Sequence, residues 1–161
     1  MPWEALILGL CGAIILAPVK INNALAQDQR KQATPPPAPD KVNGMGLPIS
    51  TKTAEHYTWG DPANPCDGWY LVQSEDLSVI EERMPPGTQE QRHVHRKSRQ
   101  FFYVLSGELT MEAGGTQHLV HAGEGIEIAP GVAHRAMNHS KSDLRILVTS
   151  QPPSHGDRQP A

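Results

Sequence analysis

The sequence is poor in aromatic residues, in cysteine and in basic charge, and each shortage limits what the protein can be. Phe, Trp and Tyr make up 5% of the 161 residues, so a hydrophobic core must depend on Val, Ile and Leu. A net charge of −3 argues against a nucleic-acid-binding protein, because contacts with phosphates require a basic surface. No repeat long enough for a solenoid is present. We therefore expect one domain with accessory segments and no nucleic-acid partner.

The chain has two cysteines, Cys11 in an apolar N-terminal run and Cys66 in a turn-like segment. If processing removes the first, the domain keeps one thiol and has no internal disulfide. No cation lies next to Cys66 in the sequence to lower its pKa. We therefore expect Cys66 to be a packing residue rather than a nucleophile.

The N-terminal segment, residues 1–26, has the pattern of a secretory signal peptide. Residues 5–19 are almost uniformly apolar, and Ala24-Leu-Ala26 is a small-x-small cleavage pattern. The apolar run is shorter than the roughly 18–20 residues of a membrane-spanning helix. These features predict an exported protein, periplasmic or secreted. An uncleaved membrane anchor is the alternative, because Glu4 stands where a signal peptide usually has a cation.

Residues 27–48 are polar and then rich in proline, which predicts an extended spacer without a core. From residue 49 to residue 161 the chain becomes strand-like, with short apolar runs separated by turn residues. The 14 glycines and 15 prolines favour many short strands over long helices. We expect an all-β domain here, an antiparallel sandwich or barrel of jelly-roll type.

Three histidines form the candidate site. His93 and His95 are two residues apart in a strand-like segment, so their side chains point to the same face. His134 follows a later turn around Gly131. Three imidazoles brought together would make a site for a divalent metal of borderline softness.

The segment 100–105 is predicted to be a strand with two apolar faces. Since both faces avoid water, the face turned away from the pocket should be covered by the N-terminal arm or by a second subunit, and we expect a homodimer. One face carries Gln100, Phe102 and Val104, and the other carries Phe101, Tyr103 and Leu105.

These residues resemble the two motifs of the cupin family. The first, G(X)5HXH(X)4E(X)6G, is matched by Gly87, His93, His95 and Gly107, with Gln100 in place of the usual Glu. The second, G(X)5PXG(X)2H(X)3N, is matched by Gly123, Gly131, His134 and Asn138, with Ala129 in place of the first Pro. The chain is similar to a small, single-domain type-2 cupin.

The resemblance implies a jelly-roll barrel with a metal inside and frequent dimerisation, but it implies no particular reaction. It assigns His93, His95 and His134 as metal ligands. Gln100 either completes the ligand set or hydrogen-bonds a substrate without touching the metal. An amide ligand leaves a divalent centre more positive than a carboxylate does, which favours Fe, Ni, Cu or Zn and an anionic small-molecule ligand.

Other residues receive supporting roles. Asn138 is expected to close a turn or to orient a neighbouring group. The sequence does not identify a general base; Glu82 and Glu127 are candidates, although we expect both to face solvent. The apolar pocket lining is predicted to be Phe102, Val104, Ile126 and Ile128, and a cationic rim that steers anions or is merely solvated is predicted at Arg92, Arg96, Lys97 and Arg99. Surface positions are expected for four histidines outside the motifs, His118, His121, His139 and His155.

Two functions fit this pattern. The first is a dioxygenase- or isomerase-like enzyme that acts on a small, anionic or enolisable organic molecule. The second is a non-catalytic module that binds or senses a metal or a metabolite. The replacement of the family's Glu by Gln100 favours the second, and the intact set of three histidines favours the first.

Overall fold

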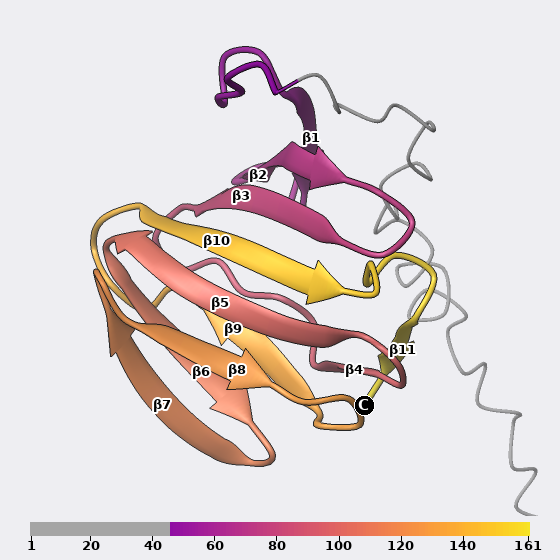
Figure 1. The fold of residues 1–161 in the computed structure, drawn as a ribbon. Coiled ribbons are helices and arrows are strands. Elements are labelled where there is room, and N and C mark those ends of the chain that lie inside the picture. Colours follow the sequence, from indigo (N-terminus) through magenta and orange to yellow (C-terminus); the bar gives the residue numbers. More distant parts are fainter. Residues whose placement is uncertain (1–45) are drawn as a thin grey trace, which may run out of the picture. The chain divides into compact units, whose positions relative to one another are not determined.

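The computed structural model describes residues 46–161, and within this range the regular structure consists of strands (Figure 1). The predicted signal segment lies outside the described residues, as do residues 27–45 of the predicted spacer. No helix in the described range is long and apolar enough to span a membrane. The strands are β1 (Glu55–Trp59), β2 (Cys66–Gln73), β3 (Ser78–Met84), β4 (His93–His95), β5 (Arg99–Ser106), β6 (Glu108–Ala113), β7 (Thr116–His121), β8 (Gly125–Ile128), β9 (His134–Met137), β10 (Leu144–Gln151) and β11 (Arg158–Pro160).

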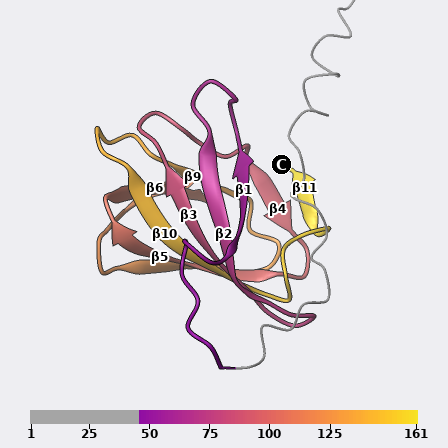
Figure 2. The ribbon, with the colours of Figure 1, turned by 90° about the horizontal axis from the view of Figure 1, so that it is seen from above.

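The strands form two antiparallel sheets. One sheet has the order β1-β2-β3-β10-β5-β8, and the other has the order β11-β4-β9-β6-β7. Strands that follow one another along the chain often lie in different sheets, as β3, β4 and β5 do, which is the pattern of a jelly roll. The prediction of an all-β, antiparallel jelly-roll domain is confirmed. Figure 2 shows β11 beside β4, with the C-terminus at that edge.

The two sheets pack face to face around one apolar core. On β5, Phe102 and Val104 are buried, whereas Phe101, Tyr103 and Leu105 are 37–44% exposed, as the alternation predicted. Each large aliphatic side chain buried in this way contributes roughly 1.5–3 kcal/mol. The core draws on both sheets and consists of Cys66, Met84, Phe102, Val104, Leu109, Met111, Val120, Ile128, Ala136, Leu144, Ile146 and Val148.

Two glycine turns fix the strand register. Gly114 and Gly115 connect β6 to β7 with φ values of 58° and 86°, a conformation that side-chain-bearing residues rarely adopt. Gly107, between β5 and β6, has φ of 83°, and a Cβ there would lie 2.6 Å from the carbonyl oxygen of Asp143. The motif glycine at position 107 is therefore required for the chain to leave β5 beside β10.

Candidate metal centre

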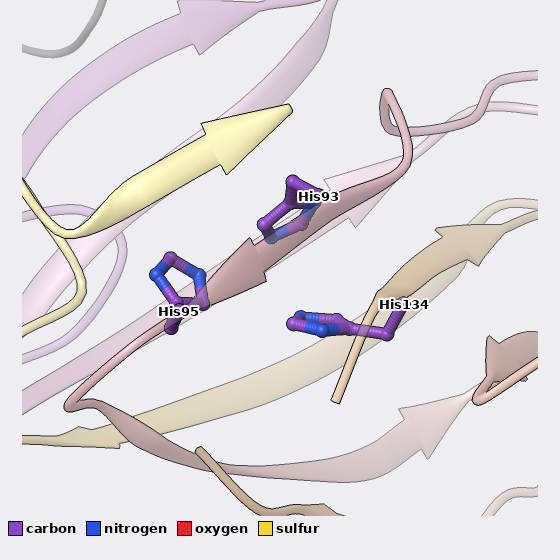
Figure 3. A group of neighbouring side chains, drawn as sticks. All are labelled: His93, His95 and His134. Atoms are coloured by element: carbon purple, nitrogen blue, oxygen red, sulfur yellow. The ribbon is translucent and has the colours of Figure 1, made fainter. Parts of the chain in front are cut away.

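The three predicted histidines meet in the interior of the domain (Figure 3). β4 presents His93 and His95 on one face, and β9 pairs with β4 so that His134 lies opposite His93. One nitrogen from each ring lies within 4.8 Å of the others, and all three side chains are buried. The spacing predicted from the sequence thus brings three nitrogen donors together.

Hydrogen bonds to the backbone set the tautomers of two rings. Nδ1 of His93 lies 2.8 Å from the carbonyl oxygen of Gln91, and Nδ1 of His134 lies 2.9 Å from that of Val132. Because a carbonyl oxygen only accepts, each Nδ1 carries the proton and Nε2 keeps a free lone pair. The Nδ1 atom of His95 is buried and has no hydrogen-bond partner. Burial lowers the pKa of His93 and that of His95 to about 4, which keeps both rings neutral.

Gln100 lies against this cluster. Its Oε1 atom is 2.8 Å from Nε2 of His134, and its amide nitrogen donates to the hydroxyl of Ser150 at 3.2 Å. The Gln100 oxygen and Nε2 of His134 are then both acceptors and cannot hydrogen-bond to each other. Either a cation binds both atoms, or the Gln100 amide is turned round so that its nitrogen donates to His134. Three imidazoles and an amide oxygen fit a divalent transition metal.

The predicted pocket residues occupy the same interior. The ring centroid of Phe102 lies 6.1 Å from that of His134. Val104 and Ile128 are buried in the core, and Ile126 is partly buried against it. These side chains form the apolar surroundings of the cluster.

Asn138 is fully buried at the end of β9, and its bonds go to the backbone rather than to a histidine. Its amide nitrogen donates to the carbonyl oxygens of Met84 and Ser142 at 2.7 and 2.8 Å. Its side-chain oxygen accepts from the backbone N–H and the hydroxyl of Ser140. Asn138 therefore joins the end of β3 to the loop after β9.

Two of the four residues of the predicted cationic rim form ion pairs on the outside of the domain, and the other two are exposed. Arg92 donates to Glu112 at 2.9 Å, and Arg99 pairs with Glu127. Arg96 and Lys97 are exposed in the turn between β4 and β5. These contacts favour the solvated-rim alternative over steering.

The cation that approaches the histidines is one that the sequence did not indicate, Arg158. Strand β11 pairs with β4, which places Arg158 opposite His95. Its guanidinium donates to the carbonyl oxygen of Gln91 at 3.1 Å. Burial is the main cause of the low pKa of His93 and of His95, and the positive charge of Arg158 lowers both pKa values further. No motif marks this residue, because its position depends on pairing with a strand some 60 residues earlier in the chain.

The expectation that Glu82 faces solvent is wrong. On β3 the side chains of Ile80, Glu82 and Met84 share the inner face, because residues two apart point the same way. Glu127 is exposed, as expected. The expectation of a surface position is also wrong for His155, which is half-buried and lies 3.3 Å from the hydroxyl of Tyr70.

Two further features lie apart from the histidines. Cys66 is buried in the core, and burial raises the pKa of its thiol to about 11, as expected for a packing residue. A cavity of about 190 Å³ contains no histidine among its lining residues, which are Gly60, Asp61, Asn64, Cys66, Gly87, Thr88 and Gln89.

Fold and site together define a class: a double-sheet jelly roll with a buried cluster of three histidines inside. The cupin domain family matches residues 80–150, a range that includes the motif residues on β4, β5 and β9. Residues 80–150 therefore form a cupin domain, and the chain is similar to small proteins of the cupin superfamily. A search of curated proteins found no match.

Solved structures support the fold. The TT1209 protein from Thermus thermophilus is 27% identical with a TM-score of 0.54, over 57% of this chain and 87% of that protein. KdgF from Halomonas sp. is 16% identical with a TM-score of 0.59, over 67% and 94% of the two chains. A predicted oxalate decarboxylase from Thermotoga maritima is 16% identical with a TM-score of 0.59, over 66% and 100%. At such identities the last two similarities concern the fold alone.

Proposed function

We propose that this protein is an exported cupin that binds one divalent transition metal, Fe, Ni, Cu or Zn, and acts on a small anionic organic molecule. The observation that supports it is the set of three buried imidazoles whose donor atoms lie within 4.8 Å of one another. The Oε1 atom of Gln100 is the fourth candidate ligand. Bound there, the metal supplies Lewis-acid polarisation of a substrate oxygen.

The charges around the site support an anionic ligand. None of the four candidate ligands brings a negative charge, so a divalent ion would keep its full charge. Arg158 adds a positive charge nearby. The ionised Glu90 offsets one of these charges and leaves an excess of positive charge for a carboxylate or enolate.

The reaction class is dioxygenase- or isomerase-like, since both chemistries hold an anionic oxygen substrate on a metal. The Thermotoga maritima protein is named for a carboxylate substrate, oxalate. Because that similarity shows the fold alone, the substrate class proposed here depends on the charges of this site. The alternative is a non-catalytic metal- or metabolite-binding module, which the replacement of the motif Glu by Gln100 favours.

Metal content tests the proposal. The full chain is expressed with its N-terminal segment, purified from the periplasmic fraction and analysed by mass spectrometry for metals and for intact mass. We expect near-stoichiometric Fe, Ni, Cu or Zn and a chain that begins at Gln27. The variant His93→Ala/His95→Ala should lose the metal, because two of three nitrogen donors are removed.

The matched control for this experiment is His118→Ala/His121→Ala, which removes two exposed histidines of β7. It should keep the metal of the wild type. A wild-type protein that takes up none of the four metals after reloading would contradict the metal-dependent function. Turnover of small keto acids by the loaded protein would separate the enzyme from the binding module.

We also expect a homodimer that uses the outer face of β5. Phe101, Tyr103 and Leu105 expose 37–44% of their surface side by side, and burying such a patch is favourable. Light scattering at micromolar concentration should give twice the mass of one chain, and Phe101→Lys/Leu105→Lys should give a single chain. A monomeric wild type would refute this expectation.

A further inference from the structure

A second polar group involves three neighbouring strands of the six-stranded sheet, β1, β2 and β3, which Figure 1 shows side by side. Its centre is Glu82, which shares the inner face of β3 with the buried Ile80 and Met84. The hydroxyl of Tyr57, on β1, lies 3.4 Å from Oε1 of Glu82. A carboxyl group on an inner face requires partners, because an isolated ionised carboxylate is strongly disfavoured in an apolar interior.

The contact between Tyr57 and Glu82 depends on a missing side chain. Strand pairing aligns Tyr57 with Gly68 and Gly68 with Glu82, so the three residues form one row across β1, β2 and β3. A Cβ at Gly68 would lie 2.3 Å from the ring of Tyr57. Only glycine leaves room for the tyrosine ring to lie across β2 and reach Glu82.

A second carboxylate, Glu90, faces this pair from the segment before β4. Its Oε2 atom accepts a hydrogen bond from the backbone N–H of Ala136 at 2.9 Å, and Arg158 approaches within 4.0 Å. Burial alone would raise the pKa of Glu90, but the positive charge of Arg158 and the hydrogen bond from the Ala136 N–H favour the carboxylate, and that pKa lies below its usual range. Glu90 is therefore the ionised member of the pair.

Glu82 has the opposite environment. Burial, and then the negative charge of Glu90, raise the pKa of Glu82 to about 8, while the Tyr57 hydroxyl and Arg158 oppose this rise. Two neighbouring carboxyl groups with pKa values pushed apart are the usual arrangement of an acid–base site. The titratable and charged groups that approach Glu82 are Tyr57, Cys66, Tyr70, Glu90 and Arg158.

The acidic pair adjoins the histidine cluster. Glu90 is three residues before His93, and its carboxylate accepts from the N–H of Ala136 on β9, the strand that carries His134. Arg158 likewise acts on both the carboxyl groups and the histidines. Glu82, on β3, and the histidines, on β4 and β9, therefore lie on the inner faces of the two facing sheets.

We propose that Glu82, positioned by the Tyr57 hydroxyl over Gly68, is the acid–base residue of this site and exchanges a proton with a small 2-keto or 2-hydroxy acid. This inference rests on the proposed function. The ionised carboxylate of Glu82 forms an O–H bond with the proton of a substrate C–H bond, and the electron pair of that bond forms an enolate. Return of a proton from Glu82 to carbon restores the C–H bond, so no oxidant or reductant is consumed.

Proton exchange into pyruvate tests this role. The full chain, loaded with Zn, is incubated with pyruvate in deuterated buffer, and loss of the methyl signal is followed by proton NMR against a protein-free sample. The wild type should accelerate exchange, and its rate should rise with pH through the pKa of Glu82, because the ionised form is the base. Glu82→Gln should slow exchange by about 10²–10⁴-fold.

Tyr57→Phe tests whether the Tyr57 hydroxyl positions Glu82 for proton transfer or only stabilises the fold. It removes a hydroxyl that favours the ionised form of Glu82, so the pKa of Glu82 should rise. The rising limb of the pH profile should then move to higher pH by about half a unit to one unit. Glu127→Gln is the matched control, because Glu127 is exposed and pairs with Arg99, and its rate and profile should equal those of the wild type.

A measurement without metal or substrate completes the test. In the metal-free full chain labelled at the Glu side-chain carboxyl carbon, the NMR signal that disappears in Glu82→Gln should titrate near pH 8. A midpoint near the ordinary value of about 4.3 would overturn the assignment. An unchanged exchange rate in Glu82→Gln would overturn it as well.

The failures of the two proposals can be told apart. If the loaded wild type binds pyruvate by calorimetry but does not accelerate exchange, the acid–base role is wrong and the anion-binding site stands. If the loaded wild type binds neither pyruvate nor oxalate, the proposed function itself is wrong, and the role of Glu82 falls with it.

Discussion

The interior of this domain contains two polar regions that arise in different ways. The histidine cluster is built from two short strands, β4 and β9, whose residues lie within two sequence motifs. The pair of Glu82 and Tyr57 is built across β1, β2 and β3, where Gly68 leaves a space between them. In the first region local spacing determines which side chains meet. In the second, the register of three strands determines it.

This difference explains why the two regions are not equally visible in a sequence. Two histidines at i and i+2 on a strand must share a face, whatever the rest of the fold does. Glu82 follows the same rule, but the sequence does not say which face of β3 is inside when the neighbouring residues, Glu81 and Arg83, are charged as well. Strand pairing identifies the inner face of β3, because Glu82 is aligned with the buried Ile146 on β10 and directly paired residues share a face of the sheet.

Asn138 connects the two regions, and removing it should have the largest effect. Its side chain joins the end of β9, which carries His134, to the carbonyl oxygen of Met84 at the end of β3. Asn138→Ala removes this bond and the bonds to Ser140 and Ser142, and leaves buried backbone groups without partners. We expect a loss of about 2–4 kcal/mol in the free energy of unfolding, measured by urea denaturation of the metal-free protein.

Asn64→Ala is the control for this prediction. Asn64 is exposed and its amide makes a longer bond of 3.3 Å to the carbonyl oxygen of Pro86. Its loss should change the unfolding free energy by less than about 0.5 kcal/mol. Equal stabilities of the two variants would show that the two regions are held together without Asn138.

Much of the fold could be predicted from the sequence, because alternation and glycine spacing are local signals. The all-β class and the two faces of β5 followed from them. The cationic rim illustrates the limit. Arg92 and Arg99 are close to the histidines in sequence, yet they pair with Glu112 and Glu127 on the outside of the domain.

Contacts between distant segments could not be predicted. Asp157 accepts hydrogen bonds from the backbone N–H groups of Lys97 and Ser98 at 2.8 and 2.9 Å. This contact holds the C-terminal segment against the turn after β4 and thereby places Arg158 beside the histidines. A single sequence contains no periodicity for such a contact, because it joins residues about 60 positions apart.

Gln100 offers the sharpest test of the division between the two regions. Gln100→Glu adds a carboxylate beside His134, and Glu82→Gln removes one from the other region. If Gln100 is a ligand, the added charge should tighten the retention of Fe or Mn by roughly 10–100-fold, measured by competition with a chelator. Glu82→Gln should leave the retention unchanged, since Glu82 makes no hydrogen bond to a histidine among the described residues.

Gln117→Glu is the matched control for the added charge, because Gln117 is exposed on β7. It should leave metal retention at the wild-type value, since a solvated carboxylate at the surface is screened by water and salt. If Gln100→Glu binds every metal as tightly as the wild type does, Gln100 is not a metal ligand. Its amide would then serve to hold Ser150 or a bound substrate, and the metal would depend on the three histidines alone.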